Sequence, residues 1–329
     1  MSSEKSFGSG WNSSGPTVSE VGEDALISVL AKPSDNPWVR VHNGDDATVV
    51  DPRGALVVMS VDAVLENQHF KREWISPGEL SSRAFAVSAS DLSAMGVSPD
   101  WALLSLVLPA DILFRDFEDL VYGLTRFCVH EKIELLGGNL TRGTQLGLHL
   151  TVGGFANDGA IPLTRSGARV GDQLWLTGSP GRAAAGRALL GSDLAGHPSG
   201  EGLEKAWKCP PKRWNFVKKL AAEMEIHAAI DISDGLALDC RRLGYASGLG
   251  TQLDLGDSVI DERMLWASQE LESDPFHWVL GGGEDYEVLI AISDDPPDWA
   301  IAEGLLWVGQ VQADASSHQI YREGAPYNP

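Results

Sequence analysis

Carboxylates occur in five short acidic motifs along the chain, most of them at the end of an apolar segment. The motifs lie at Gly44–Ala47 (GDDA), Ser60–Asp62 (SVD), Ser90–Leu92 (SDL), Asp231–Gly235 (DISDG) and Gly281–Glu287 (GGGEDYE). Carboxylate and hydroxyl oxygens are the ligands that Mg²⁺ prefers in proteins. Carboxylates contributed by both halves of a chain suit a phosphoryl-transfer site, where catalysis is mostly positioning and charge neutralisation.

Each motif also has a purely structural interpretation. The Gly44–Asp45 pair can be a simple turn. Asp62 follows an apolar strand and can cap a helix, as can Ser233 or Asp234 before the next helical segment. The three glycines at 281–283 let a backbone approach a ligand closely, or they form a flexible loop.

Asp91 leaves two interpretations open. If residues 78–95 form one helix, Asp91 shares a stripe with Leu80, Ala84 and Val87, where apolar side chains point. A charge buried there needs a partner or a metal ion. Alternatively the helix breaks, and Asp91 caps a new turn.

The segments that carry these motifs alternate between strand-like and helix-like patterns, which predicts an α/β fold. We predict strands at 55–61, 101–108, 146–152, 174–177, 229–232, 287–292 and 306–311. We predict helices at 78–95, 116–132, 182–190 and 211–224, and one after residue 234. The chain is long enough for two domains, which we place at 20–155 and 156–329. Residues 1–19, rich in Ser and Gly, are expected to be a flexible tail.

Composition excludes several classes of function. The formal net charge of −21 argues against general binding of nucleic acid or of anionic membrane surfaces, because both need a basic face. No apolar stretch approaches the roughly 20 residues that span a bilayer, and the N-terminus does not resemble a signal peptide. Three cysteines without a CxxC pair predict neither a disulfide framework nor a zinc site, and they fit the cytoplasm.

In their order and spacing, the motifs resemble the thiamine-monophosphate kinase family. The residues that carry the resemblance are GDDA, SVDAVLENQHF, SDLSAMGVSP, GGNLTRG, LTRSGARVGDQLWLTG, DISDGL and GGGEDYE. The family is similar in fold to aminoimidazole ribonucleotide synthetase. The resemblance implies an N-terminal α/β domain that binds ATP and magnesium, a C-terminal α/β domain, and a homodimer that pairs the N-terminal sheets.

The resemblance also implies direct transfer of the ATP γ-phosphoryl group to thiamine monophosphate, giving thiamine diphosphate and ADP. Matched motif by motif, it implies magnesium ligands at Asp46, Ser60, Val61, Asp62, Asp91, Asn139, Asp231 and Asp234. It implies ATP-binding residues at Tyr122, Gly138, Asn139, Arg165 and Ser233. The residues that would face thiamine monophosphate are His69, Glu284 and Tyr327. No residue is assigned as acid or base, because the attacking phosphate oxygen is already ionised at neutral pH.

Two positions depart from the family pattern. Asn139 stands where the family usually has Asp, which keeps an oxygen ligand but loses a charge. Val61 stands where Thr is common, so only its backbone carbonyl remains as a ligand.

Three rival functions can be stated. A selenophosphate synthetase-like enzyme would want a reactive cysteine near the N-terminus, and none precedes Cys128. A hydrogenase-maturation dehydratase would want a C-terminal cysteine, and none follows Cys240. The third rival is a non-catalytic protein that binds nucleotide or thiamine phosphate, an alternative that only Asn139 encourages.

Overall fold

The chain forms two compact units. The computed structural model describes residues 10–12, 14–21, 25–26, 29, 36–41, 49–50, 52, 54–156 and 161–327. The first unit comprises residues 1–89 and 99–160, and the second comprises residues 90–98 and 161–329. The second unit therefore includes the last part of a helix that begins in the first.

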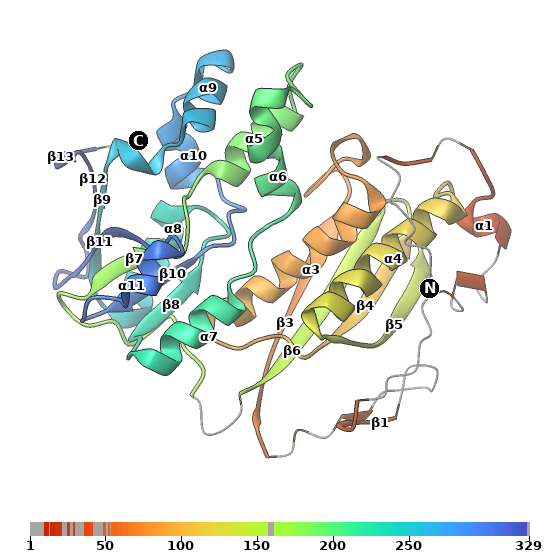
Figure 1. Ribbon diagram of the computed structural model, residues 1–329, viewed down its shortest axis with the longest axis horizontal. Coiled ribbons are helices and arrows are strands. Elements are labelled where there is room, and N and C mark those ends of the chain that lie inside the picture. Colours follow the sequence, from red (N-terminus) through yellow and green to blue (C-terminus); the bar gives the residue numbers. More distant parts are fainter. Residues whose placement is uncertain are drawn as a thin grey trace. The chain divides into compact units, whose positions relative to one another are not determined.

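The first unit is built on a four-stranded sheet in the order β3-β6-β4-β5 (Figure 1). Its strands are β3 (Leu56–Leu65), β4 (Trp101–Leu108), β5 (Glu134–Arg142) and β6 (Gly147–Ala156). β6 runs antiparallel to β3 and β4, whereas β4 and β5 are parallel. A separate pair, β1 (Val39–Val41) and β2 (Val49–Val50), is antiparallel.

Two long helices lie over one face of this sheet (Figure 1). They are α3 (Pro77–Ala94) and α4 (Phe114–Glu131), accompanied by α1 (Val18–Val21) and the short 3₁₀ helix η1 (Arg72–Trp74). The helices approach closely at Gly123, where a Cβ atom would lie 2.5 Å from the Gly78 carbonyl oxygen. The opposite face of β3 carries Val57, Met59 and Val61, which are exposed, while Val58 between them is buried.

Part of the segment expected to be a tail is bound to this unit. Asp116, which is 2% exposed, accepts hydrogen bonds from the Asn12 backbone N–H at 2.7 Å and from Asn12 Nδ2 at 2.6 Å. Trp11 Nε1 donates to the Ile75 carbonyl at 3.0 Å. Buried carboxylates are normally hydrogen-bonded, and Asn12 supplies two of the donors for Asp116. Residues 10–12 are therefore packed against the first unit and differ from the flexible tail expected over 1–19. Residues 1–9 lie outside the described residues.

The second unit contains a seven-stranded mixed sheet in the order β13-β12-β9-β11-β7-β10-β8, so β8 is an edge strand. Its strands are β7 (Gln173–Leu176), β8 (Ala228–Asp231), β9 (Gly250–Leu255), β10 (Val288–Ile292), β11 (Leu306–Gln312), β12 (His318–Arg322) and β13 (Ala325–Pro326). All the pairings are antiparallel except that of β12 with β9.

Helices cover both faces of this sheet. They are α5 (Arg182–Leu190), α6 (Glu201–Lys208), α7 (Trp214–Glu223), α8 (Leu236–Ser247), α9 (Glu262–Glu270), α10 (Pro275–Gly281) and α11 (Asp298–Ala302), with 3₁₀ helices η2 (Pro198–Gly200) and η3 (Asp257–Val259). Leu289 of β10 belongs to the core with α5, α8, α9 and α10, whereas its neighbour Ile290 packs with α7 and α11. None of the helices in the described ranges has the length and apolar character needed to cross a bilayer.

Candidate active site

The junction between β8 and α8 gathers most of the candidate groups of the second unit. Asp231 is the last residue of β8, Ser233 and Asp234 follow in the connecting loop, and α8 begins at Leu236. Gly235 has φ +112°, and a Cβ atom there would lie 2.8 Å from the Gly281 Cα atom. Only glycine fits both the left-handed conformation and this close approach.

Asp231 is a buried carboxylate close to other carboxylates. It is 5% exposed, and the Ser90 hydroxyl donates to its Oδ2 at 2.8 Å. Burial, together with the nearby charge of Asp91, raises the pKa of Asp231 to about 6. A cation bound beside Asp231 would offset both costs, so this donor set fits a divalent metal ion.

The structure resolves the two interpretations of Asp91. Helix α3 runs without a break to Ala94, so Asp91 lies within it and does not cap a new turn. Its side chain is half-buried, one residue beyond the buried Ser90 that binds Asp231. Among the described residues, however, no three His, Cys, Asp or Glu side chains group closely enough to hold a metal by themselves.

Asp239, which the sequence analysis did not select, holds this loop in place. Its carboxylate is buried, and Oδ2 accepts the backbone N–H groups of Ser233 at 3.1 Å and Asp234 at 2.9 Å. Arg242 donates to Asp239 Oδ1 at 2.7 Å and also pairs with the exposed Asp234. Burial raises the pKa of Asp239, although these donors oppose the shift. In the sequence, Asp239 looks only like an acidic residue in the first turn of a helix.

Arg165 lies in an irregular segment before β7, and its side chain is exposed. Its positive charge lowers the pKa of Asp231, against the larger effects of burial and of Asp91. Arg165 is therefore close enough to the end of β8 to act on Asp231 through space. An anion bound near Asp231 would also interact with this guanidinium group.

The side chains of the GGGEDYE motif (residues 281–287) contact different parts of the second unit. Glu284 Oε2 accepts from Trp207 Nε1 at 3.1 Å and lies 3.3 Å from Arg187 Nη1. Both Glu284 and Tyr286 have positive φ, at 63° and 51°, which is uncommon for residues other than glycine. Left-handed backbone at a loop of this kind is often retained for function.

Asp285 and Glu287 instead bind the loop between β7 and α5. Asp285 accepts the backbone N–H groups of Gly181 at 2.7 Å and Ala183 at 3.1 Å, and burial raises its pKa to about 7. Glu287 accepts a hydrogen bond from Thr177 Oγ1, directly after β7, at 2.6 Å, and two more from Arg213, before α7, at 2.6 and 2.8 Å. A pocket of about 230 Å³ adjoins these groups, lined by Ser179, Arg182, Ala183, Ala206, Cys209, Pro211, Arg213, Asp285 and Glu287.

In the first unit, the register of the sheet separates two of the expected metal ligands. Asp62 on β3 lies in one row with Leu150, Leu104 and Gly138, and Asn139 is one residue further along β5. Three strand spacings, or about 14 Å, separate β3 from β5. Ser60 and Val61 lie on β3 as well, with Val61 66% exposed. Asp46 lies outside the described residues.

Gly138 has a structural reason to be glycine. A Cβ atom there would lie 1.7 Å from the Leu104 carbonyl oxygen, so no side chain fits between β4 and β5. Tyr122 is half-buried on α4. His69 is exposed in the turn after β3, where its Nδ1 accepts the Leu65 backbone N–H at 3.0 Å. The proton of the neutral imidazole is therefore on Nε2.

Tyr327 and Glu284 lie at opposite ends of α10. The Tyr327 hydroxyl donates to Asp274 Oδ2 at 3.1 Å, and its ring centroid is 5.5 Å from that of Phe276. Asp274 caps the start of α10, whereas Glu284 comes after its end. The helix between them is about 10 Å long. The structure therefore does not bring these two expected substrate residues together.

Comparisons with known proteins give a consistent result. Residues 44–157 match the family described as AIR synthase related protein, N-terminal domain. Thiamine-monophosphate kinase of Escherichia coli (strain K12) is 33% identical over 300 residues, covering 88% of this chain and 89% of that protein. The crystal structure of thiamine-monophosphate kinase from Stenotrophomonas maltophilia K279a has a TM-score of 0.77 at 26% identity, covering 92% of this chain and 96% of that chain. A structure of AaThiL complexed with AMPPCP and TMP has a TM-score of 0.72 at 26% identity, covering 95% of this chain and 96% of that chain.

Proposed function

We propose that this chain, which belongs to the thiamine-monophosphate kinase family, transfers the γ-phosphoryl group of ATP to thiamine monophosphate and forms thiamine diphosphate and ADP. The observation that carries the proposal is the concentration of acidic and cationic groups at the β8–α8 junction, where Asp231 and Asp239 are buried. The related structure that holds AMPPCP and TMP supports the choice of both substrates.

We further propose that Asp46, Ser60, Val61, Asp62, Asp91, Asn139, Asp231 and Asp234 hold magnesium ions with the phosphate oxygens of ATP. The pKa of Asp231, raised to about 6 by burial and by Asp91, supports this because a bound cation removes the repulsion. Magnesium would supply charge neutralisation between the two phosphate groups as they approach.

The proposed role of the protein is to bind and orient the two substrates. Arg165 and Ser233 bind the ATP phosphates, and Asp239 keeps the Ser233 backbone fixed. Tyr122, Gly138 and Asn139 are the further candidates for contact with the nucleotide. The attacking oxygen belongs to the substrate phosphate, so the reaction needs no strong base from the protein.

For thiamine monophosphate we propose Glu284 as the main anchor. Its carboxylate is held by Trp207 and Arg187, and a fixed negative charge suits the cationic thiazolium ring. His69 offers its Nε2–H as a donor, and Tyr327 is the remaining aromatic candidate.

The proposed assembly is a homodimer that pairs the sheets of the first units. Three observations support it: β3 is an edge strand of the described sheet, α3 and α4 lie over the other face, and Met59 and Val61 on the face away from them are 61% and 66% exposed. The proposed compartment is the cytoplasm, where the three free cysteines stay reduced and ATP is present.

The test is turnover by the purified chain. With ATP and saturating magnesium, we expect ADP and thiamine diphosphate to form in equal amounts, and only when thiamine monophosphate is added. The Asp231→Asn variant should lose at least about 100-fold in kcat, because it removes one charge from the proposed metal site. Absence of thiamine diphosphate under these conditions would refute the proposal. Turnover restored by Asn139→Asp in an inactive wild type would favour a binding protein instead.

A further inference from the structure

The segment that carries Arg165 is irregular, and it runs beside the open edge of β8. Ala229 of β8 donates its backbone N–H to the Thr164 carbonyl at 2.9 Å. Gly167 packs on the carbonyl of His227, since a Cβ atom there would lie 2.5 Å from that oxygen, and its φ is +115°. The position of Arg165 therefore depends on how residues 164–169 are held against the residues that begin β8.

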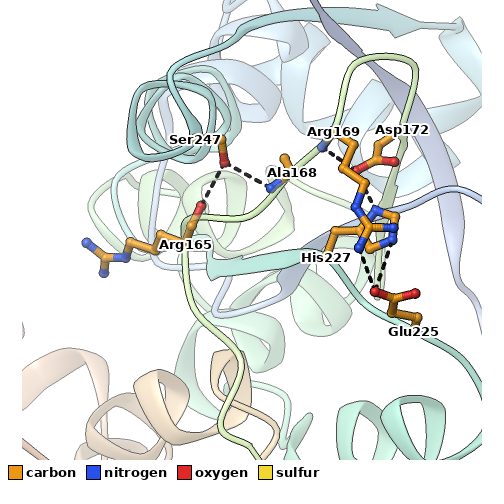
Figure 2. A network of polar contacts seen from close by, with 7 residues as sticks. All are labelled: Arg165, Ala168, Arg169, Asp172, Glu225, His227 and Ser247. Atoms are coloured by element: carbon orange, nitrogen blue, oxygen red, sulfur yellow. Dashed lines mark hydrogen bonds and ion pairs between the residues drawn. The ribbon is translucent and has the colours of Figure 1, made fainter.

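A buried imidazole–carboxylate pair lies at the base of this segment (Figure 2). His227 Nδ1 is 2.8 Å from Asp172 Oδ2, and the two side chains are 1% and 2% exposed. A carboxylate only accepts, so Nδ1 is the donor. The same Asp172 oxygen accepts the Arg169 backbone N–H at 2.7 Å. One carboxylate thus joins the residue before β8 to the end of the segment.

Two further residues, Glu225 and Ser247, hold the segment from outside. Arg169 Nη2 donates to Glu225 Oε1 at 2.7 Å, and that oxygen lies 3.7 Å from His227 Nε2. At the other end, Ser247 Oγ accepts the Ala168 backbone N–H at 3.1 Å and donates to the Arg165 carbonyl at 3.4 Å. Figure 2 shows the Arg165 side chain extending away from all of these groups. The network fixes the backbone around Arg165 and leaves its guanidinium group available.

We propose that His227 and Asp172 are positioning residues for Arg165: their buried pair fixes residues 164–169 against β8, so that the guanidinium group meets the ATP phosphates. The proposal rests on the proposed function, in which Arg165 binds these phosphates. The geometry supports it because His227 precedes β8 and Asp231 ends it, so one four-residue strand relates the pair to the site. Replacing either residue of the pair should therefore raise the KM for ATP more than the KM for thiamine monophosphate.

The chain offers a matched set of variants. In His227→Asn the amide nitrogen can take the place of Nδ1 and still donate to Asp172. In His227→Gln the amide group takes the place of Nε2 instead, so the hydrogen bond to Asp172 is lost. Asp172→Asn weakens the acceptor directly. The control is His318→Gln: His318 on β12 is also partly buried in the second unit, and its Nδ1 lies 3.0 Å from Thr251 Oγ1. All variants are compared by thermal unfolding before any other measurement.

The first readout is hydrogen exchange followed by mass spectrometry, which requires no activity. We expect exchange in residues 164–172 to be at least about tenfold faster in His227→Gln and Asp172→Asn, because one charge-assisted hydrogen bond is lost. His227→Asn and His318→Gln should match the wild type in this segment. Unchanged exchange in His227→Gln and Asp172→Asn would overturn the proposal. If His227→Gln does not fold, Asp172→Asn decides the same question.

The second readout is a double-mutant cycle with Arg165→Ala. We expect His227→Gln to raise the KM for ATP about tenfold and the KM for thiamine monophosphate less than twofold. On the Arg165→Ala background it should change neither, because the effect acts through Arg165. Equal losses on both backgrounds would overturn the proposal. If the wild type shows no turnover, the proposed function fails, while hydrogen exchange still decides whether the pair fixes the segment.

Discussion

Asp285 gives the clearest prediction of how the stability of the protein depends on pH. Burial raises its pKa from 3.8 to about 7, so the folded protein keeps a proton that the unfolded chain releases between these values. When the folded state binds more protons, the free energy of unfolding falls as pH rises, here by roughly 4 kcal/mol between pH 4 and pH 7. Above pH 7 this contribution is constant.

We predict that Asp285→Asn removes this contribution to the pH dependence of stability. The amide cannot ionise, so the variant keeps a constant cost for its poorer acceptor toward Gly181 and Ala183. The wild type should exceed the variant in stability at pH 5 and lose most of that lead by pH 8. Urea unfolding of both proteins at each pH measures the difference. A stability difference that is independent of pH would show that Asp285 is ionised throughout.

Asp239 allows a prediction about how the β8–α8 loop is held. In Asp239→Asn one amide oxygen must serve two backbone donors and Arg242, and the negative charge is lost. We expect the KM for ATP to rise about tenfold, since a tenfold change corresponds to about 1.4 kcal/mol, which is close to the lower end of the range for a hydrogen bond to a charged group. Steady-state kinetics with varied ATP measures this.

The matched control for Asp239 is Asp261→Asn. Asp261 also accepts a backbone N–H, from Met264 at 2.9 Å, and also pairs with an arginine, Arg182, but it caps α9. It should lower the Tm by a few degrees and leave the KM for ATP within twofold of the wild type. If the two variants changed the KM for ATP equally, Asp239 would have no specific role in the ATP site.

At the scale of elements, Gly138 shows that a sequence motif can have two causes. Its place in the GGN motif implied contact with a nucleotide, yet the pairing of β4 with β5 already requires a glycine. We predict that Gly138→Ala lowers the free energy of unfolding by at least about 3 kcal/mol, because the strands must separate to admit the methyl group. Urea unfolding without nucleotide measures this.

The control for this prediction is Gly10→Ala, in the same unit. A Cβ atom at Gly10 meets nothing within 4 Å, so its stability should change by less than about 0.5 kcal/mol. If Gly138→Ala were as stable as the wild type and only ATP binding suffered, the glycine would serve the nucleotide rather than the sheet.

The sequence predicted elements well where one physical signal dominates. The apolar run of β4 and the alanine-rich helix α5 have the predicted bounds, at Trp101–Leu108 and Arg182–Leu190. It did not predict β5, because Gly137 and Gly138 have low strand propensity and the strand depends on its partner. It also could not give the register that puts Asp62 and Asn139 on opposite edges, since strand pairing is a long-range property.

At the scale of the whole molecule, the proposed dimer depends on apolar side chains of β3 that are exposed in a single chain. Val57, Met59 and Val61 present an exposed apolar row on the edge strand β3, on the face that α3 and α4 do not cover. An edge strand beside exposed apolar side chains favours pairing with a second chain. The proposed dimer therefore rests on these side chains, of which Val61 is also a proposed magnesium ligand through its backbone carbonyl.

We predict that Met59→Glu gives a monomer whose fold is intact. Met59 is 61% exposed, so a carboxylate there is tolerated by one chain, but two copies would bury charges against each other. Light scattering after size exclusion should give a mass near 35.3 kDa, against twice that value for the wild type. Val129→Glu is the control, because Val129 is 75% exposed on the last turn of α4 and should leave the dimer unchanged. A wild-type mass near that of one chain, or a dimer that survives Met59→Glu, would mean that this face is not the interface.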